Sequence, residues 1–273
     1  MKTLHFRLAL ILIPVLAGAA SLAGCSAGKS AQYGTLSVTA AQKRACLQMT
    51  TFCENDPATT LQFNYAANIG DGSGITFGCI GFTTGTYSGN ILIKYYTTLN
   101  PNNILAKYIP ALNRIDSLHS GGKSDDTTGL DGFIRDVQNC TDPLFKQAQL
   151  YQLDQMYWSP ALAKATELGA KYQITLAFIY DTCVNHGAEG ADNFIVQTNA
   201  ALGGSPATGI PEVQWLTQLI QIRFNYFASR NPGATDRCSA YQRVLDSGNY
   251  NLTMPFSFRC YGDTCTINGN LGY

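Results

Sequence analysis

Charged side chains are scarce in this chain of 273 residues: they make up only 13%, and 18 basic residues face 18 acidic ones. A nucleic-acid binder needs a basic excess to neutralise phosphates, so we expect no nucleic-acid partner. Histidine occurs only at His5, His119 and His186, and no two cysteines have Cys-x-x-Cys spacing. Zinc sites usually draw on such groups, so we expect no metal and no cofactor.

Apolar runs long enough to cross a bilayer are also missing after the first two dozen residues. Residues 1–24 themselves have the order of an export signal. Lys2 and Arg7 supply positive charge, an apolar stretch runs from Leu8 to Leu16, and small residues follow. An N-terminal membrane anchor is the alternative, but the apolar run is short for one. We therefore expect a signal peptide and an exported protein.

The cysteine count adds to this expectation. Leu22-Ala23-Gly24-Cys25 is similar to the bacterial lipobox, in which the cysteine is lipidated and becomes the first mature residue. Setting Cys25 aside from the nine cysteines leaves eight, which in an oxidising compartment predicts up to four disulfide bonds of unknown pairing. We expect an extracellular protein or a cell-surface or outer-membrane lipoprotein, with a lipid anchor on Cys25.

Hydrophobic periodicity beyond the signal is mostly helical. Residues 25–38 are small and polar and predict a flexible tether, and 39–273 predict the folded domain. Helices are expected at 39–51, 91–98, 103–115, 145–156, 160–187, 212–228 and 240–247. A glycine-rich turn entering a short strand is expected at 70–82, and an irregular, cysteine-stapled segment at the end. The predicted fold is mainly α with one small β-sheet, and a sheet between helical lobes forms a cleft.

Two carboxyl groups near this turn suit glycosidic bond cleavage, which needs one protonated acid and one base that activates water. Glu54 closes the first predicted helix, and Asp71 lies in the glycine-rich turn. The residues alone leave other interpretations open. An Asp-Gly pair is usually a plain turn, a glutamate ending a helix is usually solvated, and Asp56 competes for the role of acid.

Several blocks, in order, resemble the family 46 chitosanases: Phe52 to Asn55, Ile69 to Thr76, Gly81 to Thr86, Asn103 to Leu112 and Phe145 to Gln149. The resemblance continues to Tyr261-Gly262-Asp263. It implies a two-lobed lysozyme-like fold with a substrate cleft between the lobes. It also implies endo-hydrolysis of β-1,4-linked glucosamine chains (chitosan) with inversion at the anomeric carbon.

The same resemblance implies roles for single residues. Glu54 matches the general acid, Asp71 the general base, and Thr76 the threonine that helps to hold the attacking water. Three further residues match a buried network behind the acid: Asp181, Arg223 and Arg237.

Other positions concern the substrate. Tyr65 matches a cleft tyrosine, with a core aromatic as the alternative, and His186 is either a substrate contact or a cap of the long helix. Ser73 stands where the family has an arginine, and Ser88 and Asn90 stand where an aspartate recognises the glucosamine amine. We expect weaker discrimination against N-acetylated units, because a neutral amide lacks the charge that favours an ammonium group.

Three functions follow from these observations. The leading one is a monomeric chitosanase that acts on a polysaccharide. The second is a hydrolase of another amino-sugar polymer, such as partly acetylated chitin or a cell-wall glycan. The third is a non-catalytic glycan-binding lipoprotein, against which both retained carboxylates argue.

Overall fold

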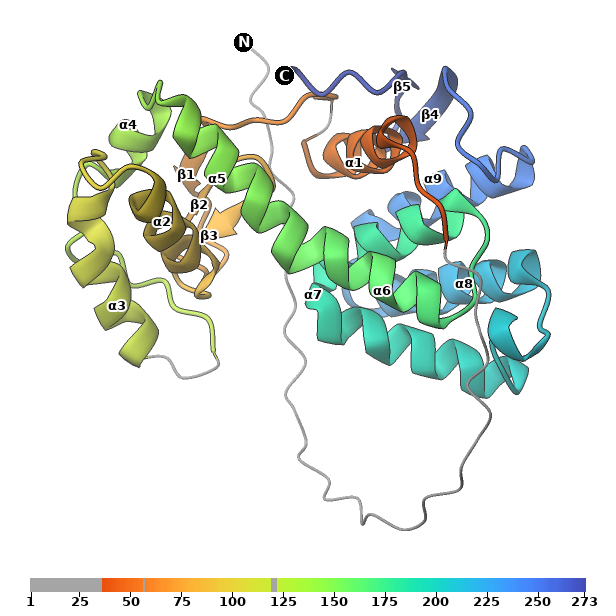
Figure 1. The fold of residues 1–273 in the computed structure, drawn as a ribbon. Coiled ribbons are helices and arrows are strands. Elements are labelled where there is room, and N and C mark those ends of the chain that lie inside the picture. The colour runs from red at the N-terminus through yellow and green to blue at the C-terminus, as the bar shows by residue number, and fades with distance from the viewer. Residues whose placement is uncertain (1–35, 56, 119–121) are drawn as a thin grey trace, which may run out of the picture. The chain divides into compact units, whose positions relative to one another are not determined.

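The computed structural model describes residues 36–55, 57–118 and 122–273 and is mainly helical, with small sheets (Figure 1). The fold class predicted from the sequence is confirmed. The predicted signal peptide, Cys25, Asp56 and His119 lie outside the described residues. Two compact units are present, one formed by residues 47–159 and 254–273 and the other by residues 36–46 and 160–253. The division into a tether and a two-lobed domain stays a prediction.

The first unit is built around a three-stranded antiparallel sheet of β1 (Ala66–Asn68), β2 (Ile75–Phe77) and β3 (Phe82–Thr83), in that order. Its helical segments are the end of α1 (Ala40–Asn55), α2 (Ser88–Leu99), η1 (Ala106–Tyr108), α3 (Ile109–Leu118), α4 (Phe133–Gln138), α5 (Pro143–Leu153) and the π-helical η2 (Asp154–Trp158). Helix α4 packs on β1 and β2, and α2 packs on β3.

Aromatic side chains form the core of this sheet layer. Phe77 on β2 meets Phe133 on α4 edge to face, with ring centroids 4.9 Å apart. Tyr108 belongs to the same group, with its ring centroid 5.1 Å from that of Phe133. Each fully buried ring contributes about 1.5–3 kcal/mol of hydrophobic stabilisation, so this cluster fixes β2 and the turn that precedes it.

The last segment is a β-hairpin, so the predicted irregular structure is wrong. Strands β4 (Phe256–Cys260) and β5 (Asp263–Ile267) pair antiparallel and form a second, two-stranded sheet. Tyr261 and Gly262 both have positive φ, 54° and 91°, as a two-residue hairpin turn requires. Phe258 and Cys260 are buried on one face, and Ser257 and Arg259, which alternate with them, are exposed, which is the alternation of a half-buried strand.

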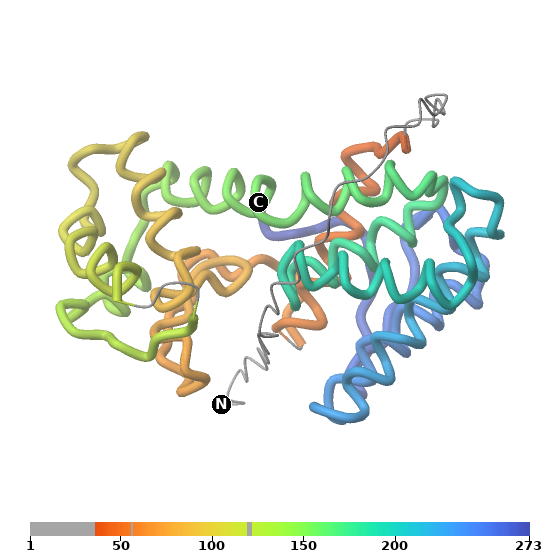
Figure 2. Tube along the Cα trace, turned by 90° about the horizontal axis from the view of Figure 1, so that it is seen from below, coloured from red at the N-terminus to blue at the C-terminus, as the bar shows by residue number. Residues whose placement is uncertain are grey.

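The second unit consists of helices. They are the start of α1, α6 (Ser159–Glu167), α7 (Gln173–Leu202), η3 (Pro206–Thr208), α8 (Glu212–Arg230), η4 (Pro232–Ala234) and α9 (Thr235–Asp246). Helix α8 packs against α7 and α9 (Figure 2). This packing brings side chains of all three helices together in the interior of the unit.

The single long helix predicted over 160–187 is also wrong. The chain leaves the helix after Glu167, turns at Gly169 (φ 71°) and enters α7 at Gln173. The carboxylate of Glu212 accepts from the backbone N–H groups of Lys171 and Tyr172 at 2.8 and 3.0 Å. A carboxylate at a helix N-terminus satisfies donors that have no partner within the helix, so Glu212 caps α7 from α8.

Candidate active site

Glu54 lies in the last turn of α1 and is only 3% exposed, with both carboxyl oxygens buried. The alternative that Glu54 is a solvated residue at the end of a helix, which the sequence left open, is therefore wrong. The C-terminal segment holds this part of α1 in place. Gln48 Oε1 accepts from the backbone N–H groups of Asn268 and Gly269 at 2.9 and 2.8 Å, and Phe52 meets Phe258 edge to face at 6.1 Å. Glu54 is thus a buried carboxyl group on a fixed support.

Asp71 lies in the turn between β1 and β2, where it is half-buried. The turn needs glycine, because Gly70, Gly72 and Gly74 all have φ between 72° and 79°. Asp71 Oδ1 accepts from Ser73 N at 3.0 Å, and Oδ2 accepts from Ser73 Oγ at 3.3 Å. The fully buried Ser73 side chain therefore orients Asp71, and its predicted contact with substrate stays a prediction.

Two backbone hydrogen bonds, which we call the backbone clamp, connect this turn to residues 85 and 124. Gly85 N donates to Ser73 O at 2.9 Å, and Ser124 N donates to Gly85 O at 3.0 Å. A Cβ atom on Gly85 would lie 1.8 Å from Ser124 O, so only glycine allows the three segments to come this close. Sequence reasoning did not find Ser124, because it lies about 50 residues from the turn and has no motif around it.

Thr76 occupies the middle of β2, opposite Ala67 on β1 and Thr83 on β3. It is fully buried, and its hydroxyl has no hydrogen-bond partner among the described residues. A buried hydroxyl without a partner costs about 1–3 kcal/mol, so native proteins rarely keep one unless a water or a ligand completes it. Thr76 therefore has the free donor and acceptor that a water-holding residue needs.

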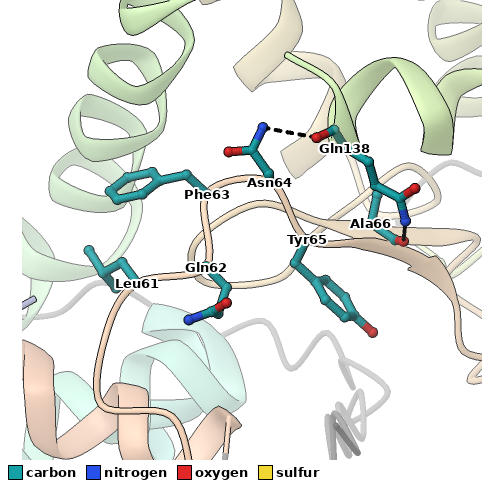
Figure 3. Close-up of a pocket in the computed structure, with 7 residues that line it drawn as sticks. All are labelled: Leu61, Gln62, Phe63, Asn64, Tyr65, Ala66 and Gln138. Carbon is teal, nitrogen blue, oxygen red and sulfur yellow. Dashed lines mark hydrogen bonds between the residues drawn. The ribbon is translucent and has the colours of Figure 1, made fainter. Parts of the chain in front are cut away.

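Tyr65 lines a cavity of about 500 Å³ together with residues 61–64, Ala66 and Gln138 (Figure 3). Two side-chain amides fix the residues that line the cavity: Asn64 Nδ2 donates to Cys140 O at 2.7 Å, and Gln138 Nε2 donates to Ala66 O at 3.0 Å. Burial raises the pKa of the half-buried Tyr65 phenol, which is therefore neutral. A neutral phenol beside a hollow fits a sugar subsite, and that role stays a prediction.

The position expected to recognise the amine lies beside a carboxylate that the sequence analysis did not identify. Asn90 is buried in the first turn of α2, and its Nδ2 donates to Asn113 Oδ1 at 3.0 Å and to Asp116 Oδ2 at 2.6 Å. The structure thus brings the carboxylate of Asp116, on α3, next to Asn90. Sequence reasoning missed Asp116 because it is 26 residues away, and Asn90 as a substrate contact stays a prediction.

Asp181, Arg223 and Arg237 form a buried ionic network in the second unit. Asp181 Oδ2 accepts from Arg223 Nη1 at 2.6 Å and from Arg237 Nε at 2.7 Å. Burial alone raises the pKa of Asp181, but the guanidinium groups of Arg237 and Arg223 outweigh it, so that the pKa falls to about 2. The three residues, one each from α7, α8 and α9, contact one another as predicted, and the place of this network behind Glu54 stays a prediction.

His186 is enclosed by aromatic rings in the second unit. Its ring centroid lies 5.0 Å from that of Phe194, 5.4 Å from Tyr226 and 5.2 Å from Phe227. Burial, followed by the charges of Arg223 and Arg237, lowers the pKa of His186 to about 2, so the imidazole is neutral. Gly187 leaves helical geometry (φ 74°, ψ 166°), so His186 ends the helical stretch before this kink in α7, and its roles as a cap or as a substrate contact both stay predictions.

Within the described residues, no three histidine, cysteine or acidic side chains are grouped so that they would hold a metal ion. No helix in that part of the chain has the length and hydrophobicity to span a membrane.

Known proteins give a consistent picture of what the chain is similar to. The family model of glycosyl hydrolase family 46 matches residues 48–256. A chitosanase of Bacillus subtilis is 34% identical over 80% of this chain and 82% of its own length, and one of a Streptomyces species is 31% identical over 98% of both. The solved structure of a family 46 chitosanase from Gynuella sunshinyii in complex with chitotetraose is 30% identical over 85% of this chain and 99% of that one, with a TM-score of 0.78.

Proposed function

This chain belongs to glycosyl hydrolase family 46, and we propose that it hydrolyses the β-1,4 bonds of chitosan with Glu54 as general acid and Asp71 as general base. Its activity as a chitosan-cleaving hydrolase rests on the chitosanase relatives and on the sugar-bound neighbours. The roles of single residues rest on the site. The two carboxyl groups lie in unlike surroundings, which is how two such groups take different tasks in one reaction.

Each carboxyl group has surroundings that suit its task. Glu54 is buried, as befits an acid that keeps its proton until it gives it to the leaving oxygen. Asp71 is half-buried and oriented by Ser73, and so remains accessible to a water molecule. We infer cleavage with inversion, in which water attacks from the face opposite the leaving group. Proton NMR of the products, taken before mutarotation, tests this by showing whether the α-anomer forms first.

The observation that carries the proposal is the hydroxyl of Thr76. It is fully buried and has no hydrogen-bond partner among the described residues. Thr76 also follows Asp71 by only five residues, in the strand that begins after the Asp71 turn. Native proteins rarely keep a buried hydroxyl in this state unless a water or a ligand completes its hydrogen bonds. We infer that this hydroxyl holds the attacking water with Asp71.

Substitution of Thr76 separates catalysis from stability. Thr76→Val keeps the branched shape and removes only the hydroxyl. We expect kcat on chitosan to fall roughly 10²-fold with KM little changed, while the free energy of unfolding stays equal or rises. Thr76→Ser, which keeps a hydroxyl, is the matched control and should retain most activity. Equal activity of the Val variant and the unmodified protein would contradict the role.

Substrate choice is tested by the reducing ends released from chitosan, chitin and peptidoglycan. We expect release from chitosan to exceed the other two clearly. Faster cleavage of chitin or of the cell-wall glycan would favour the alternative hydrolase, and release from none of them would favour a non-catalytic binder.

We further propose that the mature protein is exported, monomeric and attached to a membrane through lipid on Cys25. The support is the charged and apolar order of residues 1–24, the lipobox-like Leu22 to Cys25 and the odd number of cysteines. Mass spectrometry of the mature N-terminus tests the cleavage and the lipid anchor. An unmodified Cys25, or a chain that begins elsewhere, would contradict the anchor.

A further inference from the structure

Two cysteines far apart in the sequence meet beside the candidate acid. Cys53 Sγ, at the end of α1, lies 3.2 Å from Cys260 Sγ, the last residue of β4, and the two positions are 207 residues apart. Both side chains are buried, Cys53 at 3% exposure and Cys260 at 0%. The contact lies entirely within the first unit, next to Glu54.

The surrounding contacts show that this meeting belongs to a docked surface. Phe258 and Cys260 are two residues apart on β4 and so share its buried face. Phe52 and Cys53 are consecutive on α1, and each meets one of these two residues: Phe52 packs on Phe258, and Cys53 meets Cys260. The end of α1 is therefore held in a fixed register on the hairpin.

We propose that Cys53 and Cys260 form a disulfide bond that fastens the end of α1, and with it Glu54, to the C-terminal hairpin. Forming the bond removes two protons and two electrons from the two thiols. A disulfide-form thiol oxidoreductase of an oxidising compartment accepts them during folding, and oxidised glutathione does so in vitro, each being reduced to two thiols. The sulfur atoms approach from a nonbonded 3.2 Å to about 2.05 Å, a shift that small side-chain rotations supply.

The cross-link closes a loop of about 200 residues, and long loops lose the most freedom in the unfolded chain. Typical disulfides then raise the melting temperature of a protein of this size by roughly 5–15 °C. The proposal concerns a covalent bond in the whole chain, and its outcome is independent of the roles of Asp71 and Thr76.

Thiol counting on the full-length protein tests the pairing. The protein is folded in a buffer of reduced and oxidised glutathione, then denatured without reductant and titrated with a thiol reagent. If the bond exists, Cys53→Ser and Cys260→Ser each free one partner, and the count rises by one. The double variant should return to the count of the parent. A count that falls by one in either single variant would overturn the pairing.

A second measurement, peptide mapping of the parent protein, does not depend on whether any variant folds. Digestion of the parent with pepsin at acidic pH, without reductant, should give a linked peptide pair containing Cys53 and Cys260 that separates on reduction. Linkage of either residue to another cysteine, or of neither to any, would overturn the proposal. Reductant should lower the melting temperature of the parent by roughly 5–15 °C more than that of the double variant. An equal shift in both proteins would also count against it.

Discussion

Replacement of His186 by glutamine should remove a large part of the acid sensitivity of this protein. The imidazole is enclosed by Phe194, Tyr226 and Phe227, and its Nε2 is buried without a hydrogen-bond partner among the described residues. Protonation would place a charge among these rings and next to the cations Arg223 and Arg237. The folded protein therefore keeps His186 neutral, with its pKa lowered from 6.5 to about 2 by burial and then by these cations, against the opposing charge of Asp181.

The sign and size of the effect follow from proton linkage. Between the pKa of about 2 in the folded state and 6.5 in the unfolded state, only the unfolded chain binds a proton at His186. Acid therefore favours unfolding by about 1.4 kcal/mol for each pH unit below 6.5. At about pH 4.5 the cost is about 3 kcal/mol, a substantial part of the 5–15 kcal/mol that holds a typical domain folded. Chitosan is largely cationic in this same mildly acidic range.

Urea unfolding at several pH values between about 7.5 and 4.5 measures this cost. Relative to the unmodified protein, His186→Gln should lose about 3 kcal/mol less stability over that range, whatever its stability at neutral pH. Tyr226→Phe is the matched control, because it alters the same aromatic group and keeps the His186 imidazole, and its slope should equal that of the unmodified protein. Equal slopes for His186→Gln and the unmodified protein would refute the reasoning.

Two further predictions concern the buried ionic network of the second unit and the backbone contacts of the turn that holds Asp71. Asp181→Asn should destabilise the second unit by about 3–5 kcal/mol in urea unfolding, because it removes the carboxylate that two buried guanidinium groups share. Asp192→Asn, at an ion pair whose aspartate is 54% exposed, should change stability by less than about 1 kcal/mol, and equal losses would contradict the account. Gly85→Ala should lower both stability and kcat, because its Cβ would lie 1.8 Å from Ser124 O, whereas Gly122→Ala has nothing within 4 Å and should leave both unchanged. A fully active Gly85→Ala variant would show that the clamp does not position Asp71.

Much of the helical fold could be predicted, because apolar residues recur at helical spacing along it. The errors lie where tertiary contacts decide. The break between α6 and α7 has one local signal, Gly169 with its positive φ, but the cap that Glu212 gives α7 from 41 residues away could not be predicted from local sequence. The hairpin was predictable in principle, since Phe256, Phe258 and Cys260 alternate with polar residues before a Tyr261-Gly262 turn, but its short strands offered little periodicity.

In the candidate site, too, some features could be predicted from the sequence and others could not. Glu54 and Asp71 could be selected by a family motif, but the motif does not say that Glu54 is buried or that Thr76 keeps its hydroxyl without a partner among the described residues. The motif also omits the segments that contact the site from far along the chain, such as the C-terminal hairpin, which meets Phe52 and Cys53, and Ser124, which bonds to Gly85. The sequence and its family resemblance predicted Asn90 where the family has an aspartate, whereas the carboxylate of Asp116 beside it could not be predicted.

The central claim, that Glu54 and Asp71 are the acid and the base of chitosan cleavage, is tested most directly by single-turnover rates of Glu54→Gln and Asp71→Asn on a chitosan oligomer. Each variant should lose roughly 10²–10⁴-fold in rate while it binds the oligomer with nearly unchanged affinity. Asp56→Asn, which removes the competing carboxylate, should stay close to the unmodified rate. A severe loss in Asp56→Asn together with a mild one in Glu54→Gln would contradict the account.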